Sequence, residues 1–401
     1  MTAAGRQHPA DRRPRLLVVA STFPATTGDG TPRFVQDLSV QEAESFDVRV
    51  LVPMVPGAAR TERLSAHVTV DRFRYFPRRW EDLAAGAMLE NVKVRRSRWV
   101  QVPAFVGAEA AAITRAIRQF RPDVLHVHWT IPQGLSALIA NRKLPRLITS
   151  HGADAYALSG GASDLIKRTV LRKADAVTGV NEQIVQRLVD LGADPGRTSV
   201  VPMGANTTAV AAGGRDVERT PGRIIAVGRL VEKKGFGVLL DAVRQLPHDL
   251  TWSLEIVGEG PLRASLEDRA AGLPVRFWGE LPEREVYQRL AAAPIAVVPS
   301  VPSRSGDQDG LPVTMIEAMA AGCAVVASRL PGLQDAIVHE HCGLLVTPGK
   351  TTELSAAIER LLRDDATARQ MGEAAAARAE AFSIRVSGQR YREILMDLLK
   401  R

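Results

Sequence analysis

Short, continuous apolar runs alternate with amphipathic helical segments along this chain of 401 residues. A short unbroken apolar run is typical of a parallel strand, because such a strand is buried on both faces. The segments between the runs carry apolar residues three and four positions apart, as in a helix that covers a sheet. The alternation predicts an α/β fold with doubly wound parallel sheets. We expect strands at 16–20, 48–52, 124–127, 147–149, 176–180, 199–202, 224–227, 253–257, 275–277, 295–298 and 324–327, and helices at 108–120, 182–191, 237–245, from near 312, and from near 351 onward.

The alternation is interrupted at 207–222, where Gly, Pro, Thr and charged residues replace the apolar runs. This composition is typical of a linker. Because domains usually contain roughly 100–200 residues, two Rossmann-like domains are expected, with a ligand site in the cleft between them. The predicted division is a disordered basic N-terminus at 1–14, an N-terminal domain at 15–206, the linker at 207–222, a C-terminal domain at 223–380 and a final helix at 381–401.

The net charge of +8 makes an anionic partner such as a nucleotide or a phospholipid surface plausible. Charge is the only feature that suggests nucleic acid, and we expect none as a partner. Residues 1–14 resemble no signal peptide, and no apolar run reaches the roughly 20 residues that span a bilayer. We therefore expect a cytoplasmic protein that meets a membrane only peripherally. Cys323 and Cys342 lie far apart and predict neither a disulfide framework nor a metal site.

Residues 72–98 combine eight Lys and Arg side chains with four aromatic ones. Two interpretations stay open. The stretch is a solvated face of the N-terminal domain, or it is an interfacial patch that binds an anionic membrane surface.

A glycine and two cations follow the strand expected at 224–227. Gly228 allows the backbone to approach a phosphate, and the next helix offers unpaired N–H groups at its start. Arg229 and Lys234 add two positive charges, and a guanidinium fork fits phosphate oxygens. On spacing alone, the segment fits a diphosphate site and a solvated surface turn equally well.

Two other strand ends carry weaker signals. The turn at 258–261, which contains Gly260, fits either a ligand site or an ordinary connection between strand and helix. Trp278 either flanks a flat base or belongs to the core.

Two carboxylates bracket a helix start after the strand at 295–298. Asp309 precedes Gly310-Leu311-Pro312, and proline suits a first helical turn. Glu317 follows eight residues after Asp309, which keeps both carboxylates on one side at ~3.6 residues per turn. Such a pair can hold the hydroxyls of a sugar and of a ribose. The alternative is a helix-capping Asp and a buried structural Glu.

These segments together resemble glycosyltransferase family 4, through its acidic-x7-acidic signature at 309–317. That family has the GT-B fold, in which two Rossmann-like domains face a central cleft and the C-terminal helix returns to the N-terminal domain. It retains the configuration of the transferred sugar. The resemblance covers nearly the whole chain. Matching segments lie at 227–230, 233–235, 258–261, 322, 324–328, 331–332 and 343–346, and in the N-terminal half at 22–24, 28–31, 126–128 and 150–152.

The resemblance implies roles for matching residues in the C-terminal half. Arg229 and Lys234 would hold the donor diphosphate and stabilise it as the leaving group. Asp309 would bind the donor sugar and Glu317 the ribose. Further donor contacts are implied or suggested for Gly260, Trp278, Gly310, Leu311 and Pro312.

It also implies roles in the N-terminal half. Gly28, Gly30 and Thr31 belong to a loop that would approach the phosphate and the acceptor. His128 matches the position whose imidazole faces the transferred sugar, and His151 is a weaker candidate on the acceptor side.

The sequence departs from the family at two positions. Asp309 replaces the usual Glu and is one methylene shorter, so contacts with the sugar are expected to shift. Asn206 stands where a Val-Asp pair usually ends, which removes a charge near the linker.

Asp307-Gln308-Asp309 also matches the metal-binding Asp-x-Asp of a different class, the GT-A transferases. We favour no metal and no cofactor, because Arg229 and Lys234 supply the positive charge that a metal provides there.

The resemblance implies a retaining transfer from a nucleotide-diphosphate sugar to a hydroxyl acceptor. The acceptor would be a lipid-linked glycan, a polysaccharide precursor or a secondary metabolite. Two alternatives stay open: an inverting GT-B transferase, which needs a general base in the N-terminal domain, and a non-catalytic protein that binds nucleotide sugars.

Overall fold

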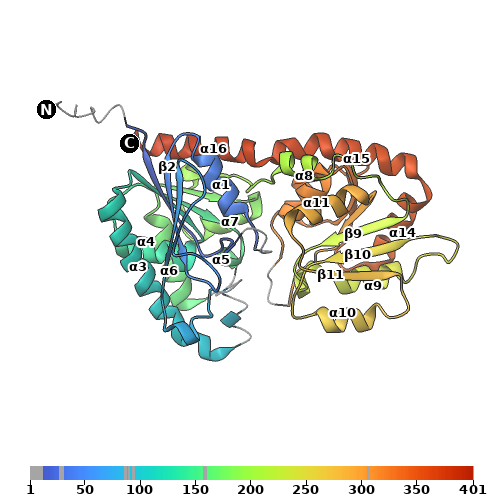
Figure 1. Ribbon diagram of the computed structural model, residues 1–401, viewed down its shortest axis with the longest axis horizontal. Helices are drawn as coiled ribbons and strands as arrows, with labels where there is room; N and C mark the ends of the chain where they lie inside the picture. Colours follow the sequence, from blue (N-terminus) through green and yellow to red (C-terminus); the bar gives the residue numbers. More distant parts are fainter. Residues whose placement is uncertain are drawn as a thin grey trace.

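The structure is a computed structural model that describes residues 12–26, 31–84, 88, 91–92, 95–156, 160–304 and 308–400. Two α/β domains lie side by side, and the last helices run along one side of both (Figure 1). Each domain is built on its own sheet and its own apolar core. The predicted fold class, two doubly wound domains, is confirmed.

The sheet of the N-terminal domain has eight strands in the order β3-β4-β2-β1-β5-β6-β7-β8. All neighbours are parallel except β3, which pairs antiparallel with β4. The strand order reverses at β1, because β2 lies on one side of it and β5 on the other. Ligands bind at such a switch point in open α/β sheets. The strands are β1 Arg15–Val19, β2 Asp47–Pro53, β3 Thr61–Arg63, β4 Val68–Phe73, β5 Val124–His128, β6 Arg146–Ser150, β7 Ala176–Gly179 and β8 Thr198–Val200.

Helices cover this sheet because each turns an apolar stripe toward it. Helix α7 begins where Asn181 accepts a hydrogen bond from the Ile184 amide, and it buries Ile184 and Leu188. The helices with described bounds are α1 Phe34–Glu42, α3 Gln101–Phe120, α4 Leu135–Ala140, α5 Ala153–Tyr156, α6 Gly161–Arg172 and α7 Glu182–Asp190.

The sheet of the C-terminal domain is parallel throughout, in the order β11-β10-β9-β12-β13-β14. Its switch point lies between β9 and β12, so the loops that follow these two strands meet at one edge. The strands are β9 Arg223–Val227, β10 Ser253–Val257, β11 Val275–Gly279, β12 Ile295–Val298, β13 Ala324–Ser328 and β14 Gly343–Val346, and the helices are α8 Thr207–Gly213, α9 Phe236–Val243, α10 Arg263–Arg269, α11 Glu283–Ala292, α12 Val313–Ala320, α13 Pro331–Ala336, α14 Thr351–Arg363 and α15 Asp365–Ala379.

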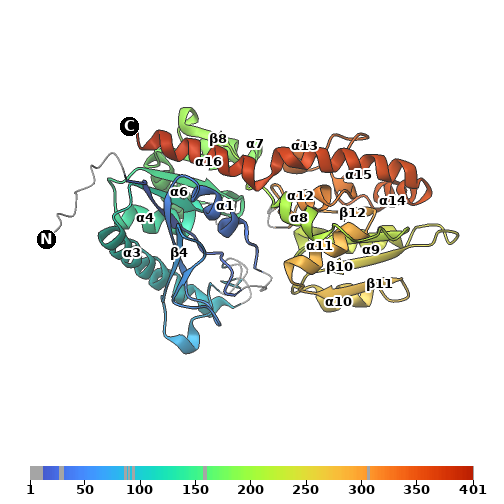
Figure 2. The same ribbon diagram turned by 45° about the horizontal axis from the view of Figure 1, so that its top comes forward.

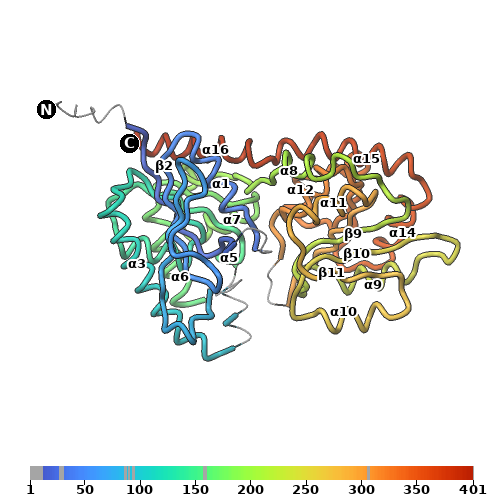
Figure 3. The backbone as a smooth tube through the Cα atoms, in the orientation of Figure 1, coloured from blue at the N-terminus to red at the C-terminus, as the bar shows by residue number. Residues whose placement is uncertain are grey.

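The chain passes between the domains twice, and the two passages are hydrogen-bonded to each other. The Ala205 amide donates to the Phe382 carbonyl (3.0 Å), and the Ile384 amide donates to the Ala205 carbonyl (2.7 Å). Helix α16, Ile384–Leu398, then packs against α1 of the N-terminal domain. Figure 2 shows α15 and α16 following one another along both domains, and Figure 3 traces the same path of the backbone.

Part of the segment predicted as a linker is a docked helix. Helix α8 occupies 207–213 and packs on α11 and α12 of the C-terminal domain. Its glycines are explained by close packing, because a Cβ at Gly213 would lie 2.9 Å from Cβ of Tyr287, and one at Gly214 would lie 2.6 Å from Cβ of Ala291. Gly213 and Gly214 therefore allow α8 to pack closely against α11.

The predicted basic and aromatic stretch at 72–98 begins inside the sheet. Arg72 and Phe73 end strand β4 and are buried, and Tyr75 is buried beside them. The Arg72 guanidinium pairs with Glu62 and donates to the Pro24 carbonyl. The solvated part of the stretch is therefore shorter than predicted.

Candidate active site

Lys234 and Asp309 meet at the switch point of the second sheet. Lys234 ends a short 3-10 helix at Glu232–Lys234 in the loop after β9, and Asp309 lies in the loop after β12. The Val301 amide donates to the Lys233 carbonyl (2.8 Å) and joins the two loops. Gly235 has a φ of +68°, and a Cβ there would overlap the Pro299 carbonyl, so this approach requires glycine.

Asp309 is a buried carboxylate with three partners. The Lys234 ammonium lies 2.9 Å from its Oδ2, the Lys233 ammonium 3.9 Å from its Oδ1, and the Ser300 hydroxyl donates to Oδ2 at 2.6 Å. Burial is the largest single influence and raises the pKa of Asp309, but Lys234, Lys233 and the Ser300 hydrogen bond together outweigh burial and lower that pKa. Helix α12 starts only at Val313, so Asp309 is an ion-pair residue and does not cap the helix.

Glu317 lies on α12 in different surroundings. The Tyr287 hydroxyl donates to Glu283 at 2.7 Å and lies 3.4 Å from Glu317. Burial, followed by the charges of Glu283 and Asp37, raises the pKa of Glu317 to about 7. Glu317 therefore faces a group of carboxylates that includes one from the N-terminal domain.

Two residues of the N-terminal domain also belong to this charged group: Asp37 of helix α1, and Arg33, which directly precedes that helix. The Arg33 guanidinium lies 3.1 Å from Glu283 across the two domains. Burial raises the pKa of Asp37 to about 6, opposed by Arg33 and supported by Glu283. No motif in the sequence marks Arg33, Asp37, Glu283 or Tyr287, because each is a single polar residue on or next to a helix.

Arg229 lies five residues before Lys234 in the chain, and its side chain is exposed. It makes no ion pair with any residue in the described part of the structure. Lys234 forms an ion pair with Asp309. Of the two candidate cations, Arg229 is therefore the one without a carboxylate partner among the described residues.

Gly260 lies in the loop after β10, which packs against the loop after β9 that carries Arg229 and Lys234. The Leu230 amide donates to the Glu259 carbonyl (2.9 Å), and the Leu262 amide donates to the Leu230 carbonyl (3.1 Å). A Cβ at Gly260 would lie 2.5 Å from the Leu230 carbonyl oxygen. Gly260 thus sets the position of the segment that follows Arg229.

The suggestion that Trp278 flanks a flat base is not supported by its surroundings. The guanidinium carbon of Arg276 lies 3.5 Å from the ring centroid, and that of Arg289 lies 3.3 Å from it. Two guanidinium groups cannot occupy one position, so they cover opposite faces of the ring. No face is left for a base to stack on.

The loop with Gly310, Leu311 and Pro312 reaches the N-terminal domain. A Cβ on Gly310 would contact Val180 and Ile184, and the Gln308 amide donates to the Gln183 side chain (2.7 Å). A Cβ at Gly332 would overlap the Gly310 carbonyl oxygen. Leu311 is half-buried and Pro312 is buried before α12. Residues of both domains therefore contact the backbone at 310–312, which is predicted to contact the sugar.

His128 ends β5 at the switch point of the first sheet and is fully buried. Its Nδ1 lies 3.0 Å from Nε2 of His151, and its Nε2 has no partner among the described residues. Burial, then His126 and His151, lowers the pKa of His128 well below 6.5. Burial and His126 lower the pKa of His151 to about 3. Both rings are therefore neutral near pH 7.

Thr31 is half-buried three residues before α1. Gly28 and Gly30, the other residues expected in this loop, lie outside the described residues, as does Asp307 of the Asp-x-Asp sequence. Among the described residues, no group of three or more His, Cys, Asp or Glu side chains could hold a metal ion. Within the same residues, no helix has the length and apolar character needed to cross a membrane.

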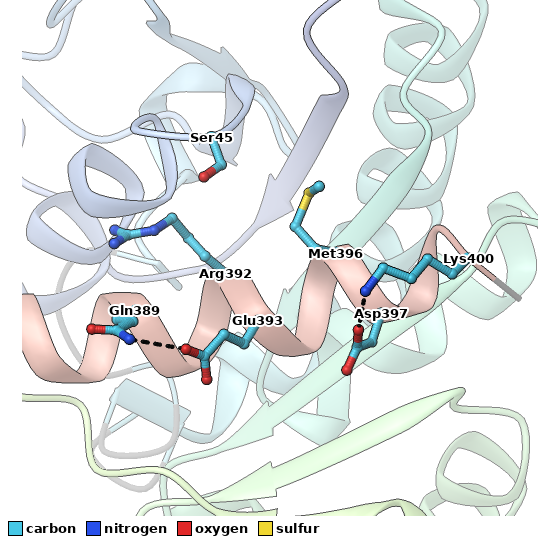
Figure 4. Close-up of a pocket in the computed structure, with 7 residues that line it drawn as sticks. All are labelled: Ser45, Gln389, Arg392, Glu393, Met396, Asp397 and Lys400. Atoms are coloured by element: carbon cyan, nitrogen blue, oxygen red, sulfur yellow. Dashed lines mark hydrogen bonds and ion pairs between the residues drawn. The ribbon is translucent and has the colours of Figure 1, made fainter. Parts of the chain in front are cut away.

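A surface pocket lies elsewhere, along α16 and near the end of α1 (Figure 4). The Arg392 guanidinium there pairs with Glu44 (2.8 Å) and Lys400 with Asp397 (2.8 Å). Its cations are already neutralised, and none of the candidate site residues lines it. The remaining residues that line it are Ser45, Gln389, Glu393 and Met396.

Two family models match the chain, one for each domain. Residues 221–364 match the group 1 glycosyl transferases, and residues 29–204 match the glycosyl transferase 4-like domain. Amylovoran biosynthesis glycosyltransferase AmsK of Erwinia amylovora is 30% identical over 298 residues, which are 70% of this chain and 72% of AmsK. The putative colanic acid biosynthesis glycosyltransferase WcaL of Escherichia coli K12 is 31% identical over 243 residues, 57% of this chain and 58% of WcaL.

Solved structures share the two-domain fold. Sucrose-phosphate synthase of Thermosynechococcus elongatus aligns with a TM-score of 0.77 at 22% identity, over 97% of this chain and 100% of that one. Anabaena HepE in complex with UDP-glucose aligns with a TM-score of 0.69 at 17% identity, over 96% and 99%. At these identities the likeness establishes the fold.

Proposed function

The chain belongs to the group 1, family 4 glycosyltransferases, and we propose that it transfers a sugar from a nucleotide-diphosphate sugar to a hydroxyl acceptor with retention at the anomeric carbon. The observation that carries this proposal is the Lys234–Asp309 ion pair at the switch point of the second sheet. Arg229 lies in the same loop after β9 as Lys234, and Glu317 is the fifth residue of helix α12, which begins four residues after Asp309.

In this proposal the donor diphosphate lies against Arg229 and Lys234. The two cations stabilise the charge that develops on the departing phosphate, in a site already arranged before the reaction. A guanidinium can hold two phosphate oxygens at once, whereas an ammonium acts as a point charge. No metal is needed for this task, so transfer is expected to continue in EDTA.

Asp309 accepts hydrogen bonds from hydroxyls of the donor sugar, and Glu317 accepts them from the ribose. Asp309 is held by Ser300 and Lys234, so its shorter side chain is fixed in place. Glu317 has to be ionised to accept from both ribose hydroxyls. Its raised pKa of about 7 therefore makes donor affinity dependent on pH near neutrality.

Retention follows if the acceptor attacks from the face that the diphosphate leaves. The bond between the anomeric carbon and the phosphate oxygen breaks, and the acceptor oxygen forms its bond on the same face. The acceptor proton passes to the departing phosphate oxygen. The protein then acts by positioning and by charge stabilisation, and neutral His128 supplies a hydrogen bond to the transferred sugar.

We propose a glycan precursor as the acceptor, since the similar proteins AmsK and WcaL are named for amylovoran and colanic acid biosynthesis. A lipid-linked precursor would place the enzyme on the cytoplasmic face of the plasma membrane. A secondary metabolite is the other acceptor class that the fold accommodates.

An exposed surface on the N-terminal domain supports peripheral membrane binding. Arg78, Arg79 and Trp80 form one short 3-10 helix, and Arg96 and Trp99 lie on another. Asp82 joins the two segments through Arg98 (2.8 Å). Trp80 is 53% exposed and Trp99 48% exposed, and exposed arginines lie next to Trp80 and near Trp99 in the chain, a combination suited to a membrane interface.

Flotation with liposomes tests this surface. Trp80→Ala with Trp99→Ala should abolish binding to anionic vesicles, whereas Ile139→Ser, an exposed apolar residue on α4, should leave it unchanged. Equal flotation of wild type and the double variant would exclude this surface as the membrane contact.

A transfer assay tests the function itself. UDP-, GDP- and dTDP-sugars are incubated with candidate acceptors in EDTA, and NMR reads the anomeric configuration of the product. Retention with activity in EDTA supports the proposal. An inverted product would favour an inverting GT-B transferase. Nucleotide-sugar binding with neither transfer nor hydrolysis would favour a non-catalytic protein.

A further inference from the structure

Four rings are stacked from helix α16 to the switch point of the first sheet. Tyr391 of α16 lies 5.2 Å from His126 between ring centroids, His126 lies 4.3 Å from His128, and His128 lies 5.2 Å from His151. Adjacent ring planes differ by 30°, 33° and 23°. The ring of His128 is thus held between His126 behind it and His151 beside it.

Both ring nitrogens of His126 are occupied. Its Nδ1 lies 2.5 Å from Oε1 of Glu42, and its Nε2 lies 2.8 Å from the Thr149 hydroxyl, which in turn lies 2.7 Å from the Thr178 hydroxyl. Glu42 and His126 are each fully buried. His126 therefore has no polar atom left for a substrate and can act only through its neighbours.

Oε1 of the buried Glu42 lies against Nδ1 of the buried His126, so a carboxyl group faces this imidazole, and a buried pair of this kind depends on both partners. Positive charge at His126 opposes a second proton on His128 and on His151, and this charge adds to burial in lowering the pKa of each. His128 thereby keeps one N–H and one lone pair near neutral pH.

Other charged and polar groups face the stack from each neighbouring element. Asp154 of α5 accepts from the His151 amide (3.1 Å) and the Thr130 amide (2.7 Å). Tyr391 donates its hydroxyl to the Val201 carbonyl (3.1 Å). Asp154 is committed to backbone amides, which leaves Glu42 as the carboxylate that contacts an imidazole of the stack.

We propose that the Glu42–His126 pair, backed by Tyr391, is a positioning device that keeps His128 neutral and fixes its ring toward the transferred sugar. This inference rests on the proposed function. Glu42, His126 and Tyr391 are positioning residues, because they touch His128 or its neighbour and not the substrate. Helix α16 would then contribute to the reaction through Tyr391 and this stack of rings.

Glu42→Gln tests the pair, since it keeps the shape and removes the counter-charge. We expect kcat to fall at least about tenfold, the scale of a small misplacement at a reacting centre. The donor KM should stay within about threefold, because Arg229 and Lys234 of the other domain carry donor binding. NMR of histidine-labelled protein should show the His128 titration moving upward by about half a unit or more.

Glu109→Gln is the matched control. Glu109 is a fully buried carboxyl of the same domain, and burial raises its pKa to about 8, so it is protonated at neutral pH and resembles glutamine. The Glu109→Gln variant should leave kcat and the histidine titrations unchanged. Tyr391→Leu removes the ring behind His126 and keeps the ion pair; it should lower kcat without moving the titrations.

The readouts separate a failure of this inference from a failure of the proposed function. Unchanged kcat and unchanged His128 titration in Glu42→Gln, with transfer abolished in Lys234→Ala, would overturn the positioning device alone. A loss of thermal stability with no change in the titration would also overturn it, because that pattern indicates a purely structural pair. If wild type transfers no sugar, the NMR titration still decides whether Glu42 controls His128.

Discussion

The Lys234 ammonium lies 2.9 Å from the Asp309 carboxylate, so the cation assigned to the donor diphosphate and the carboxylate assigned to the donor sugar form one ion pair. Ser300 fixes the same carboxylate oxygen at 2.6 Å. Both side chains are therefore oriented before a donor arrives. Side chains that are already oriented lose less conformational freedom when the donor binds.

Lys234→Ala should reduce both stability and activity, because it removes a charge from the donor site and the nearest cation from a buried carboxylate. We expect the free energy of unfolding to fall by about 1–3 kcal/mol, less than for a fully isolated pair because Lys233 lies 3.9 Å from Asp309. The value of kcat/KM should fall by about 100-fold or more.

A double variant separates the two effects. Asp309→Asn in the Lys234→Ala background removes the uncompensated charge, so chemical denaturation should recover most of the lost stability while activity stays low. Recovery of activity in the double variant would show that Lys234 serves only to neutralise Asp309.

Arg229→Ala should reduce activity without reducing stability. The side chain is exposed and has no ion-pair partner among the described residues, so the free energy of unfolding should change by less than about 0.5 kcal/mol. The value of kcat/KM should fall about 100-fold. Arg369→Ala, an exposed arginine of α15, is the control and should retain full activity.

Glu317 should make the protein less stable as pH rises. Its pKa is raised to about 7 from 4.5, so the folded state binds the proton more tightly than the unfolded state. This contribution is complete below pH 4.5 and is lost as pH rises through 7. Asp309 acts in the opposite direction, because its lowered pKa gives a contribution that is lost only as pH falls below 3.8.

Glu317→Gln should therefore stabilise the protein at pH 8 by about 3 kcal/mol relative to wild type, and should not do so at pH 4. Thermal unfolding across pH 4–8 measures the difference. Glu285→Gln, an exposed residue of α11, should leave the pH dependence unchanged. An equal gain at both pH values in Glu317→Gln would contradict the assigned shift.

Gly332→Ala should disturb the loop that carries Asp309. A Cβ at Gly332 would overlap the Gly310 carbonyl oxygen, so the backbone beside the donor sugar has to move. We expect the donor KM to rise by about tenfold or more. Gly107→Ala, on helix α3 with no atom within 4 Å of the new Cβ, should leave KM unchanged.

The paired sheets were predictable because buried strands carry an unmistakable apolar signal. The strands at 253–257 and 295–298 lie where they were predicted. Strand β4 was not predicted, because its exposed-face residues alternate with buried ones and its end, Arg72 and Phe73, was interpreted as a basic surface. The glycines of 207–214 suggested a linker, although close packing against Tyr287 and Ala291 is what requires them.

The candidate site was predictable only where a motif gathers it in the chain. Lys234, Asp309 and Glu317 were named from spacing and resemblance, and the first two are in contact. The contacts of Arg33 with Glu283 and of Glu42 with His126 join residues far apart in sequence, and only the fold brings them together. Trp278 was named from its position at a strand end, but two arginines cover its ring.

Isothermal titration of nucleoside diphosphates and monophosphates, in EDTA, tests the central claim most directly. We predict that UDP, GDP or dTDP binds wild type at least about tenfold more tightly than the matching monophosphate, a difference of ~1.4 kcal/mol. Lys234→Ala should remove this preference, and Glu317→Gln should weaken both ligands equally. Equal affinity for diphosphate and monophosphate in wild type, or an unchanged preference in Lys234→Ala, would contradict the assignment of the donor site.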